Sequence, residues 1–266
     1  MQLTSLLYSP TGATRKVVRA FAEGFGGTYT ENDITLPKDR ERPLTDSGEG
    51  LFVLAGPVYG GRCFKMLTGA AAKLSGQGRP VVLIVTYGGR HYDRALADLY
   101  EAASEAGFQT VSCGAFIGEH SFSAKIQTGR PKEDDLQRAR EYGAEVRRRL
   151  EEGSLTPMAA EAIPQRDVDI AAIGSHRKHL GSLAPNRPIP TDACLHCGTC
   201  AAVCPLGLID PADSNKIEEQ CIKCNACVKA CPAGAMQFPQ EGFKATAENC
   251  EQTFGTRPCS PEVWFA

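Results

Sequence analysis

Two stretches of the chain, CLHCGTCAAVCP from Cys194 and CIKCNACVKACP from Cys221, share the pattern CxxCxxCxxxCP. A chain of 266 residues can bury a full hydrophobic core and does not need many disulfides to fold. In a reducing compartment, cysteines grouped at such intervals bind metal far more often than they form disulfides. The two motifs, which hold eight of the 12 cysteines, therefore predict metal–sulfur chemistry.

The spacing within each motif separates zinc from iron–sulfur. A structural zinc site usually takes two CxxC pairs set apart, whereas three thiolates at consecutive CxxC intervals and a fourth before proline are typical of 4Fe-4S binding. The fourth cysteine lies too far along the chain to reach the cluster of its own motif and ligates the other one. The ligands expected for cluster I are Cys194, Cys197, Cys200 and Cys231. Those expected for cluster II are Cys221, Cys224, Cys227 and Cys204, and in this region the chain resembles the two-cluster bacterial ferredoxins.

A second kind of chemistry is indicated near the N-terminus, in YSPTGATRK. The hydroxyls of Ser9, Thr11 and Thr14, with the backbone of Gly12 and Ala13, suit a small anion at a helix N-terminus. No GKS, GKT or GxGxxG pattern is present, which disfavours ATP and NAD. Taken alone, the loop is equally compatible with an ordinary capped helix start.

Two further loops, GPVYGGRC and TYGGRHYD, are rich in glycine and contain aromatic residues. The N-terminal loop YSPTGATRK resembles the phosphate loop of flavodoxins, which bind FMN. This resemblance implies that GPVYGGRC and TYGGRHYD enclose the isoalloxazine ring. The residues so implied are Pro57, Val58, Tyr59, Gly60 and Gly61, and Thr86, Tyr87, Gly88, Gly89, Arg90 and Tyr92. These loops carry tyrosines and no tryptophan, so the stacking residue stays open among Tyr59, Tyr87 and Tyr92.

The elements that position these loops alternate between apolar strands and amphipathic helices. We expect strands at 3–8, 28–34, 51–55, 81–86 and 110–117, and helices at 13–23, 64–74, 94–106 and 132–151. Runs such as VVLIVT, apolar at nearly every position, suit parallel strands covered on both faces. The fold class expected is α/β, with a five-stranded parallel doubly wound flavodoxin-like sheet and a small α+β two-cluster ferredoxin domain.

The chain as a whole resembles the flavodoxin–ferredoxin fusion proteins of anaerobic bacteria and archaea. The expected organisation is an FMN-binding domain at 1–152, a connector at 153–190, a ferredoxin domain at 191–239 and a tail at 240–266. Within the connector, GSHRKHLGSLAPNRPIP is predicted to be a solvated linker rather than a phosphate site.

The two kinds of cofactor suggest an electron relay between FMN, two 4Fe-4S clusters and an external redox partner. An alternative is a reductase in which the clusters supply electrons to FMN and a small organic substrate binds at its exposed face. No catalytic residue is identified, although Glu119 and His120, in GEHSFS, are weak candidates for acid–base groups.

Composition restricts the partners. The net charge of −2 gives no sign of nucleic-acid or membrane-surface binding. No run approaches the roughly 18 apolar residues of a membrane span, and the N-terminus lacks a signal-peptide pattern, so we expect a cytoplasmic protein. Acidic residues around the cysteine motifs suit a partner with a basic docking surface, and the protein is expected to be a monomer or a homodimer.

Overall fold

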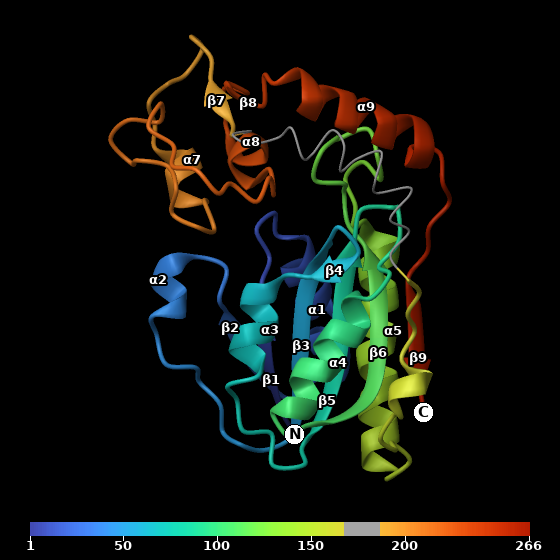
Figure 1. The fold of residues 1–266 in the computed structure, drawn as a ribbon. Coiled ribbons are helices and arrows are strands. Elements are labelled where there is room, and N and C mark those ends of the chain that lie inside the picture. The colour runs from blue at the N-terminus through green and yellow to red at the C-terminus, as the bar shows by residue number, and fades with distance from the viewer. Residues whose placement is uncertain (168–186) are drawn as a thin grey trace.

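The computed structural model describes residues 1–167 and 187–266 (Figure 1). Its main sheet contains five parallel strands: β1 (Gln2–Leu7), β2 (Thr28–Asp33), β3 (Leu51–Tyr59), β5 (Pro80–Tyr87) and β6 (Gln109–Ile117). They lie in the order β2-β1-β3-β5-β6. This is the flavodoxin-like order 2-1-3-4-5, in which the chain winds outward in both directions from β1 and β3. The expected fold class is confirmed.

Helices cover both faces of this sheet, as the continuous apolar strands require. The helices α1 (Ala13–Phe25) and α5 (Glu133–Glu151) pack on one face, and α3 (Lys65–Ala71) and α4 (Ala95–Glu105) pack on the other. Each face has its own buried core. Strand β5 has its seven residues from Val81 to Tyr87 buried, which explains why its sequence does not alternate.

The C-terminal residues add elements that the sequence analysis left as a tail. Residues Glu241–Phe254 form helix α9, and residues Glu262–Phe265 form strand β9, which pairs antiparallel with β6 at the sheet edge. Trp264 of β9 packs edge-on against Tyr92, and Ser112 Oγ donates to the Trp264 carbonyl at 2.6 Å. A short helix, α2 (Pro37–Arg40), and a short strand, β4 (Arg62–Cys63), lie in segments expected to be loops.

The cysteine motifs belong to a small separate unit, residues 187–238, here called the cysteine unit. The strands β7 (Ile189–Pro190) and β8 (Met236–Gln237) pair antiparallel and close it. Its two short helices, α7 (Thr199–Ala202) and α8 (Ala226–Ala230), both end ahead of the proline that follows each motif. A 3-10 turn, η1 (Ala160–Ala162), precedes the part of the connector that lies outside the described residues, 168–186, and most of the expected linker falls there.

Figure 1 shows the cysteine unit above the carboxyl edge of the sheet, on the side of α2 and α3, with α9 crossing beside it. Polar contacts with the sheet domain help to hold this position. Arg40 Nη2 donates to the Pro205 carbonyl at 2.9 Å, and Lys229 Nζ pairs with Glu119 Oε1 at 2.6 Å. No helix within 1–167 or 187–266 is long and apolar enough to cross a bilayer.

The close packing of α1 on α5 depends on glycine. A Cβ atom at Gly143 of α5 would lie 2.0 Å from the Phe21 carbonyl oxygen, so the two helix backbones could not keep their present separation. We expect Gly143→Ala to lower the free energy of unfolding by about 1–3 kcal/mol, because overpacking forces the backbones apart. Gly69→Ala in α3, where a Cβ meets nothing within 4 Å, is the control and should have no destabilising effect. Urea denaturation of the two variants checks this, and equal midpoints would contradict the packing argument.

Candidate functional site

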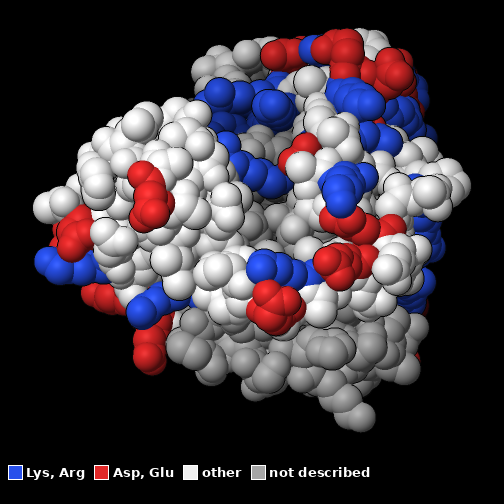
Figure 2. All heavy atoms as spheres, turned by 90° about the horizontal axis from the view of Figure 1, so that it is seen from above, with Lys and Arg blue, Asp and Glu red and all other residues white. Residues whose placement is uncertain are grey.

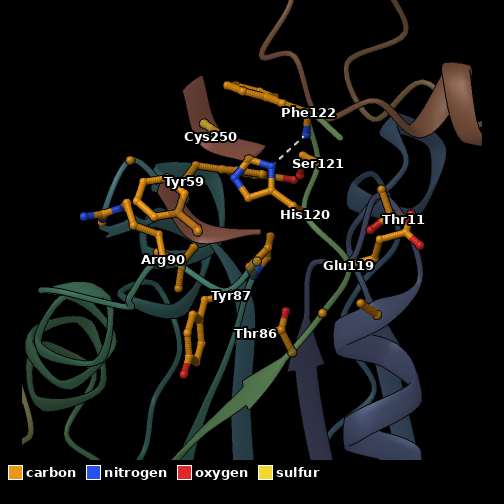
Figure 3. A pocket seen from close by; sticks show the side chains of 18 of the residues that line it. Thr11, Tyr59, Thr86, Tyr87, Arg90, Glu119, His120, Ser121, Phe122 and Cys250 are labelled. Carbon is orange, nitrogen blue, oxygen red and sulfur yellow. Dashed lines mark hydrogen bonds between the residues drawn. The ribbon is translucent and has the colours of Figure 1, made fainter. Parts of the chain in front are cut away.

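A cavity of about 190 Å³, partly open to solvent, lies at the carboxyl ends of β1, β3, β5 and β6 (Figure 3). Carboxyl ends at the switch point of a doubly wound sheet are the usual ligand site of such folds. Residues from all three flavin loops of the sequence analysis line it: Thr11, Ala13, Pro57, Val58, Tyr59, Gly60, Gly61, Thr86, Tyr87, Gly88 and Arg90. The two candidate acid–base residues, Glu119 and His120, line it as well.

The first loop wraps the N-terminus of α1. Gly12 caps the helix with φ 82°, a left-handed conformation that favours glycine. The backbone N–H groups of Thr11, Ala13 and Thr14 find no acceptor among the described residues. Unpaired N–H groups at the positive end of a helix dipole form a natural anion site.

Two of the three predicted hydroxyls have other partners. The Ser9 hydroxyl accepts from the Arg15 N–H at 3.0 Å and so shapes the helix start. The buried Thr14 hydroxyl shares a 2.6 Å hydrogen bond with the Thr86 hydroxyl, which joins the first loop to the third. Ser9, Gly12 and Thr14 do not line the cavity, whereas Thr11 does.

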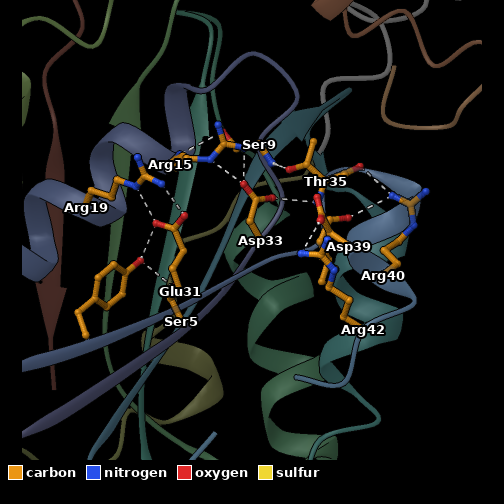
Figure 4. A network of polar contacts seen from close by, with 12 residues as sticks. Ser5, Ser9, Arg15, Arg19, Glu31, Asp33, Thr35, Asp39, Arg40 and Arg42 are labelled. Carbon is orange, nitrogen blue, oxygen red and sulfur yellow. Dashed lines mark hydrogen bonds and ion pairs between the residues drawn. The ribbon is translucent and has the colours of Figure 1, made fainter. Parts of the chain in front are cut away.

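A polar network behind this loop fixes its position (Figure 4). Thr35 Oγ1 accepts from the Ser9 N–H at 2.7 Å, and Asp33 Oδ1 accepts from the Thr35 N–H at 2.9 Å. Asp33 also pairs with Arg15 of α1 through the Arg15 Nε at 2.6 Å. The end of β2 therefore holds both sides of the anion loop.

The second loop is a tight hairpin between β3 and β4. Gly60 and Gly61 have φ of 59° and 79°, as the two central residues of a type I′ turn require. Gly61 also passes so close to Asp93 that a Cβ there would lie 2.2 Å from its Oδ2. Tyr59, before the turn, lines the cavity and packs edge-on against Phe64 at 5.9 Å.

The third loop is organised around the fully buried Asp93. Burial disfavours its carboxylate, but hydrogen bonds with His91, Arg166 and Arg90 outweigh this and lower the pKa of Asp93. Arg90 is thereby held at the cavity rim.

The tyrosines of these loops differ in position. Tyr87 and Tyr92 are buried and pack edge-on against each other at 5.7 Å, and Tyr87 is directed away from Tyr59 and His120 in Figure 3. Tyr92, expected at the flavin, lies in the core against Trp264 and not on the cavity wall, and Gly89 is also off the wall. Of the three tyrosines, Tyr59 is the one placed to stack on a planar ligand.

The roof of the cavity comes from residues that the flavin loops did not predict. His120, Ser121 and Phe122 follow β6, and Thr246, Cys250 and Phe254 come from α9. The buried residues Phe243, Cys250 and Phe254 recur on one face of α9. This helical spacing is the sequence pattern from which the helix could have been predicted.

Glu119 and His120 have defined partners. Burial disfavours the Glu119 carboxylate, but hydrogen bonds from Lys229 and the Gly129 N–H outweigh this and lower its pKa. Glu119 therefore links the sheet domain to the cysteine unit and stays ionised. His120 Nδ1 accepts from the Phe122 N–H at 3.1 Å, so in the neutral ring the proton is on Nε2. Figure 3 shows the His120 ring between those of Tyr59 and Phe122.

The eight motif cysteines line two separate cavities in the cysteine unit. One is lined by Cys194, Cys197, Cys200 and Cys231, and the other is lined by Cys204, Cys221, Cys224 and Cys227. Each cavity thus takes three thiols from one motif and the fourth from the other.

The second cysteine cavity adjoins the sheet domain. Ile222, between Cys221 and Cys224, lines both this cavity and the large one. Burial raises the pKa of the Cys224 thiol to about 12, as expected for a sulfur removed from water and without a compensating cation. The first cysteine cavity lies further out, where Cys197 is exposed.

Comparison with known proteins agrees with this division of the chain. Residues 193–236 match the family described as a 4Fe-4S dicluster domain. No match was found among curated proteins.

Several solved flavodoxin structures match the chain over its sheet domain. A flavodoxin from the domain Archaea is 13% identical with a TM-score of 0.42, covering 57% of this chain and 99% of that one. A flavodoxin, WrbA-like protein from Agrobacterium tumefaciens is 19% identical with a TM-score of 0.40, covering 57% and 98%. The fold assignment rests on the strand order, and not on these distant matches. A sheet domain with the flavodoxin strand order followed by a 4Fe-4S dicluster domain is the organisation of a flavodoxin–ferredoxin fusion, and this chain has it.

Proposed function

We propose that this chain is an electron-transfer protein that binds FMN in the large cavity and a 4Fe-4S cluster in each cysteine cavity. The observation that carries the proposal is the position of Ile222, which is part of the cluster II loop and of the flavin cavity wall at once. Because electron tunnelling falls steeply with distance, shared walls between the two cavities favour transfer within one molecule. When bound, the clusters exchange single electrons, and FMN exchanges one or two together with protons.

The residues present fit FMN. The free N–H groups of the α1 cradle suit a phosphate, and Tyr59 with Gly60, Gly61 and Gly88 forms a wall against which a planar ring can lie. Figure 2 shows a hollow beside the cysteine unit with Lys and Arg side chains along it, which favours an anionic ligand.

The outer cluster is the natural contact for a redox partner. Leu195, which is 67% exposed, lines the cluster I cavity, and Ile189, which is 43% exposed, precedes its wall residue Pro190. Asp192, Asp210 and Asp213 are near cavity-lining residues in the sequence. The surface of the unit carries few charged side chains in Figure 2. An apolar centre with acidic residues nearby suits a partner with a basic rim, and complementary charge of this kind mainly raises the association rate.

A second function is favoured by the roof of the cavity. His120, Phe122 and Phe254 form a partly apolar ceiling over the flavin loops, with one imidazole that can hold a proton on Nε2. Such a space fits a flavin-dependent reductase of a small organic substrate, supplied with electrons by the clusters. Turnover of candidate acceptors by the reduced protein alone distinguishes a reductase from a carrier.

Cofactor content is the first prediction. Anaerobically purified protein should contain about eight iron atoms with acid-labile sulfide, and about one non-covalent FMN. Cys204→Ala should remove cluster II and keep cluster I, since Cys204 lines only the cavity of Cys221, Cys224 and Cys227. Iron and sulfide assays with EPR check both statements. Loss of the cluster held by Cys194, Cys197 and Cys200 instead would exclude the crossed ligation.

The anion cradle gives a second prediction. Gly12→Val places a side chain at a left-handed position beside the N–H groups expected to meet the phosphate, so flavin content should fall at least tenfold while iron content stays constant. Gly26→Val is the matched control, because Gly26 has φ 70° at the other end of α1 and open space around its Cβ position. Flavin absorbance per chain, read with iron content, is the measurement. Equal flavin in the two variants would place the flavin elsewhere.

The docking of the cysteine unit gives a third prediction. In the wild-type protein the rate of electron transfer between flavin and clusters should not change with protein concentration. Lys229→Ala removes the pair with Glu119, worth about 0.2–1 kcal/mol for a partly exposed pair, and should slow the transfer by up to about fivefold.

Stopped-flow spectroscopy at several protein concentrations measures these rates. Lys244→Ala, which removes an exposed pair within α9, is the control and should leave the rate unchanged. A wild-type rate proportional to concentration would mean that transfer occurs between molecules.

A further inference from the structure

Tyr8, directly after β1, carries a buried hydroxyl without a partner. The residue is 0% exposed, and its hydroxyl makes no hydrogen bond to any described residue. Leaving a buried hydroxyl unpaired costs about 1–3 kcal/mol, so such a group calls for a specific explanation. A ligand that accepts this hydrogen bond would provide one.

The direction of Tyr8 follows from the alternation of the strand. Leu7 faces α1 and α5, whereas Tyr8 faces the opposite core and stacks on Phe64 with ring centroids 4.8 Å apart. This is the side of α2 and α3, above which the cysteine unit lies in Figure 1. The contact of Arg40 with Pro205 brings the Cys204 loop to this side. Tyr8 does not line the flavin cavity.

The groups that act electrostatically on Tyr8 belong to cluster II and its docking contact. Burial raises the pKa of the Tyr8 phenol, Cys224 and Cys204 raise it further, and Arg40 partly opposes them. A neutral phenol can donate a hydrogen bond. Ile222, two residues before Cys224, packs against the buried core cluster that contains Tyr8, so the loop of Cys221 and Cys224 lies on this side of the sheet.

The two cysteine motifs are equivalent in spacing, and in the first of them a hydroxyl lies beside a cysteine sulfur. In the first motif the Cys197 sulfur lies 3.2 Å from the Thr199 hydroxyl. The equivalent ligand in the second motif is Cys224, since both are the second cysteine of their motifs. The residue equivalent to Thr199 is Ala226, which has no hydroxyl. Cluster II thus lacks from its own unit the donor that cluster I has.

We propose that the Tyr8 hydroxyl donates a hydrogen bond to the Cys224 sulfur when the cluster is bound, and so replaces from the sheet domain the hydroxyl missing at Ala226. A donor to a ligand sulfur stabilises the more negative, reduced cluster and raises its reduction potential. Tyr8 is then a positioning residue for cluster II. This inference rests on the part of the proposed function that places a cluster at Cys204, Cys221, Cys224 and Cys227, and is independent of the direction of electron flow.

Tyr8→Phe tests the inference, because it keeps the ring on Phe64 and removes only the hydroxyl. In an EPR-monitored redox titration, the cluster whose signal Cys204→Ala abolishes should become about tenfold harder to reduce, a fall of about 59 mV for one electron. The other cluster should not move. Thr199→Val should give the complementary result, a shift of cluster I alone. Thr110→Val, which removes another buried unpaired hydroxyl at the far end of the sheet, is the control and should shift neither.

A second readout is independent of potentials. ENDOR spectroscopy after exchange into deuterated water should detect an exchangeable hydrogen near cluster II in the wild-type protein and not in Tyr8→Phe. Normal iron content with both potentials unmoved, or a shift equally produced by Thr110→Val, would overturn the role of Tyr8 alone. Protein that cannot bind iron at these cysteines would overturn the proposed function, and the inference with it.

Discussion

The parallel sheet places the carboxyl ends of β1, β3, β5 and β6 at one edge, and every proposed functional feature of this protein depends on that edge. Parallel strands all end in the same direction, so loops far apart in the chain converge there. The anion cradle of α1, the hairpin at Gly60 and Gly61, and the loop held by Asp93 meet in this way. Each loop then keeps its shape through local chemistry: a helix cap, a glycine turn and a buried carboxylate.

The position of the cysteine unit on this edge is a second consequence. Its polar contacts with the sheet domain are few: Arg40 with Pro205, and Lys229 with Glu119 and the His120 carbonyl. Partly exposed pairs of this kind add little stability each, so they orient the unit more than they stabilise it. Ile222 and the neighbouring Tyr8, Tyr59 and Phe64 supply the apolar contact between the two cofactor regions. An electron path between the proposed cofactors would cross these apolar side chains.

The C-terminal residues give the cavity a character that a simple carrier does not need. Helix α9 adds Thr246, Cys250 and Phe254 to its roof, and β9 fixes the following segment to the edge of the sheet. A flavin that only exchanges electrons with proteins benefits from an exposed edge, whereas a roofed cavity restricts access to small molecules. The same structure therefore supports relay through the clusters and leaves room for a small acceptor.

The sequence alone determined the cysteine chemistry and the fold class, because both depend on local patterns. Thiolates at fixed intervals specify a cluster through the reach of the chain, and apolar runs separated by amphipathic helices specify a doubly wound sheet. The three loops that meet at the large cavity were recognisable for the same reason, since glycine and hydroxyl residues follow directly after strands.

Only the tertiary structure decided which residues together line the large cavity. It buried Tyr92 in the core away from the cavity, and it left Tyr59 and the largely buried Tyr87 on the cavity wall. It also paired Glu119 with Lys229. It packed Ile222 of the second cysteine motif against the core that contains Tyr8, and it brought residues of α9 onto the wall of the large cavity. These outcomes depend on packing between segments more than 100 residues apart, such as Glu119 with Lys229 and Arg40 with Pro205, and no local pattern encodes such pairings. Two motifs of equal spacing could not show which cysteine cavity lies nearer to the large cavity. The structure distinguishes them, because only the second motif contributes a residue, Ile222, to the wall of the large cavity.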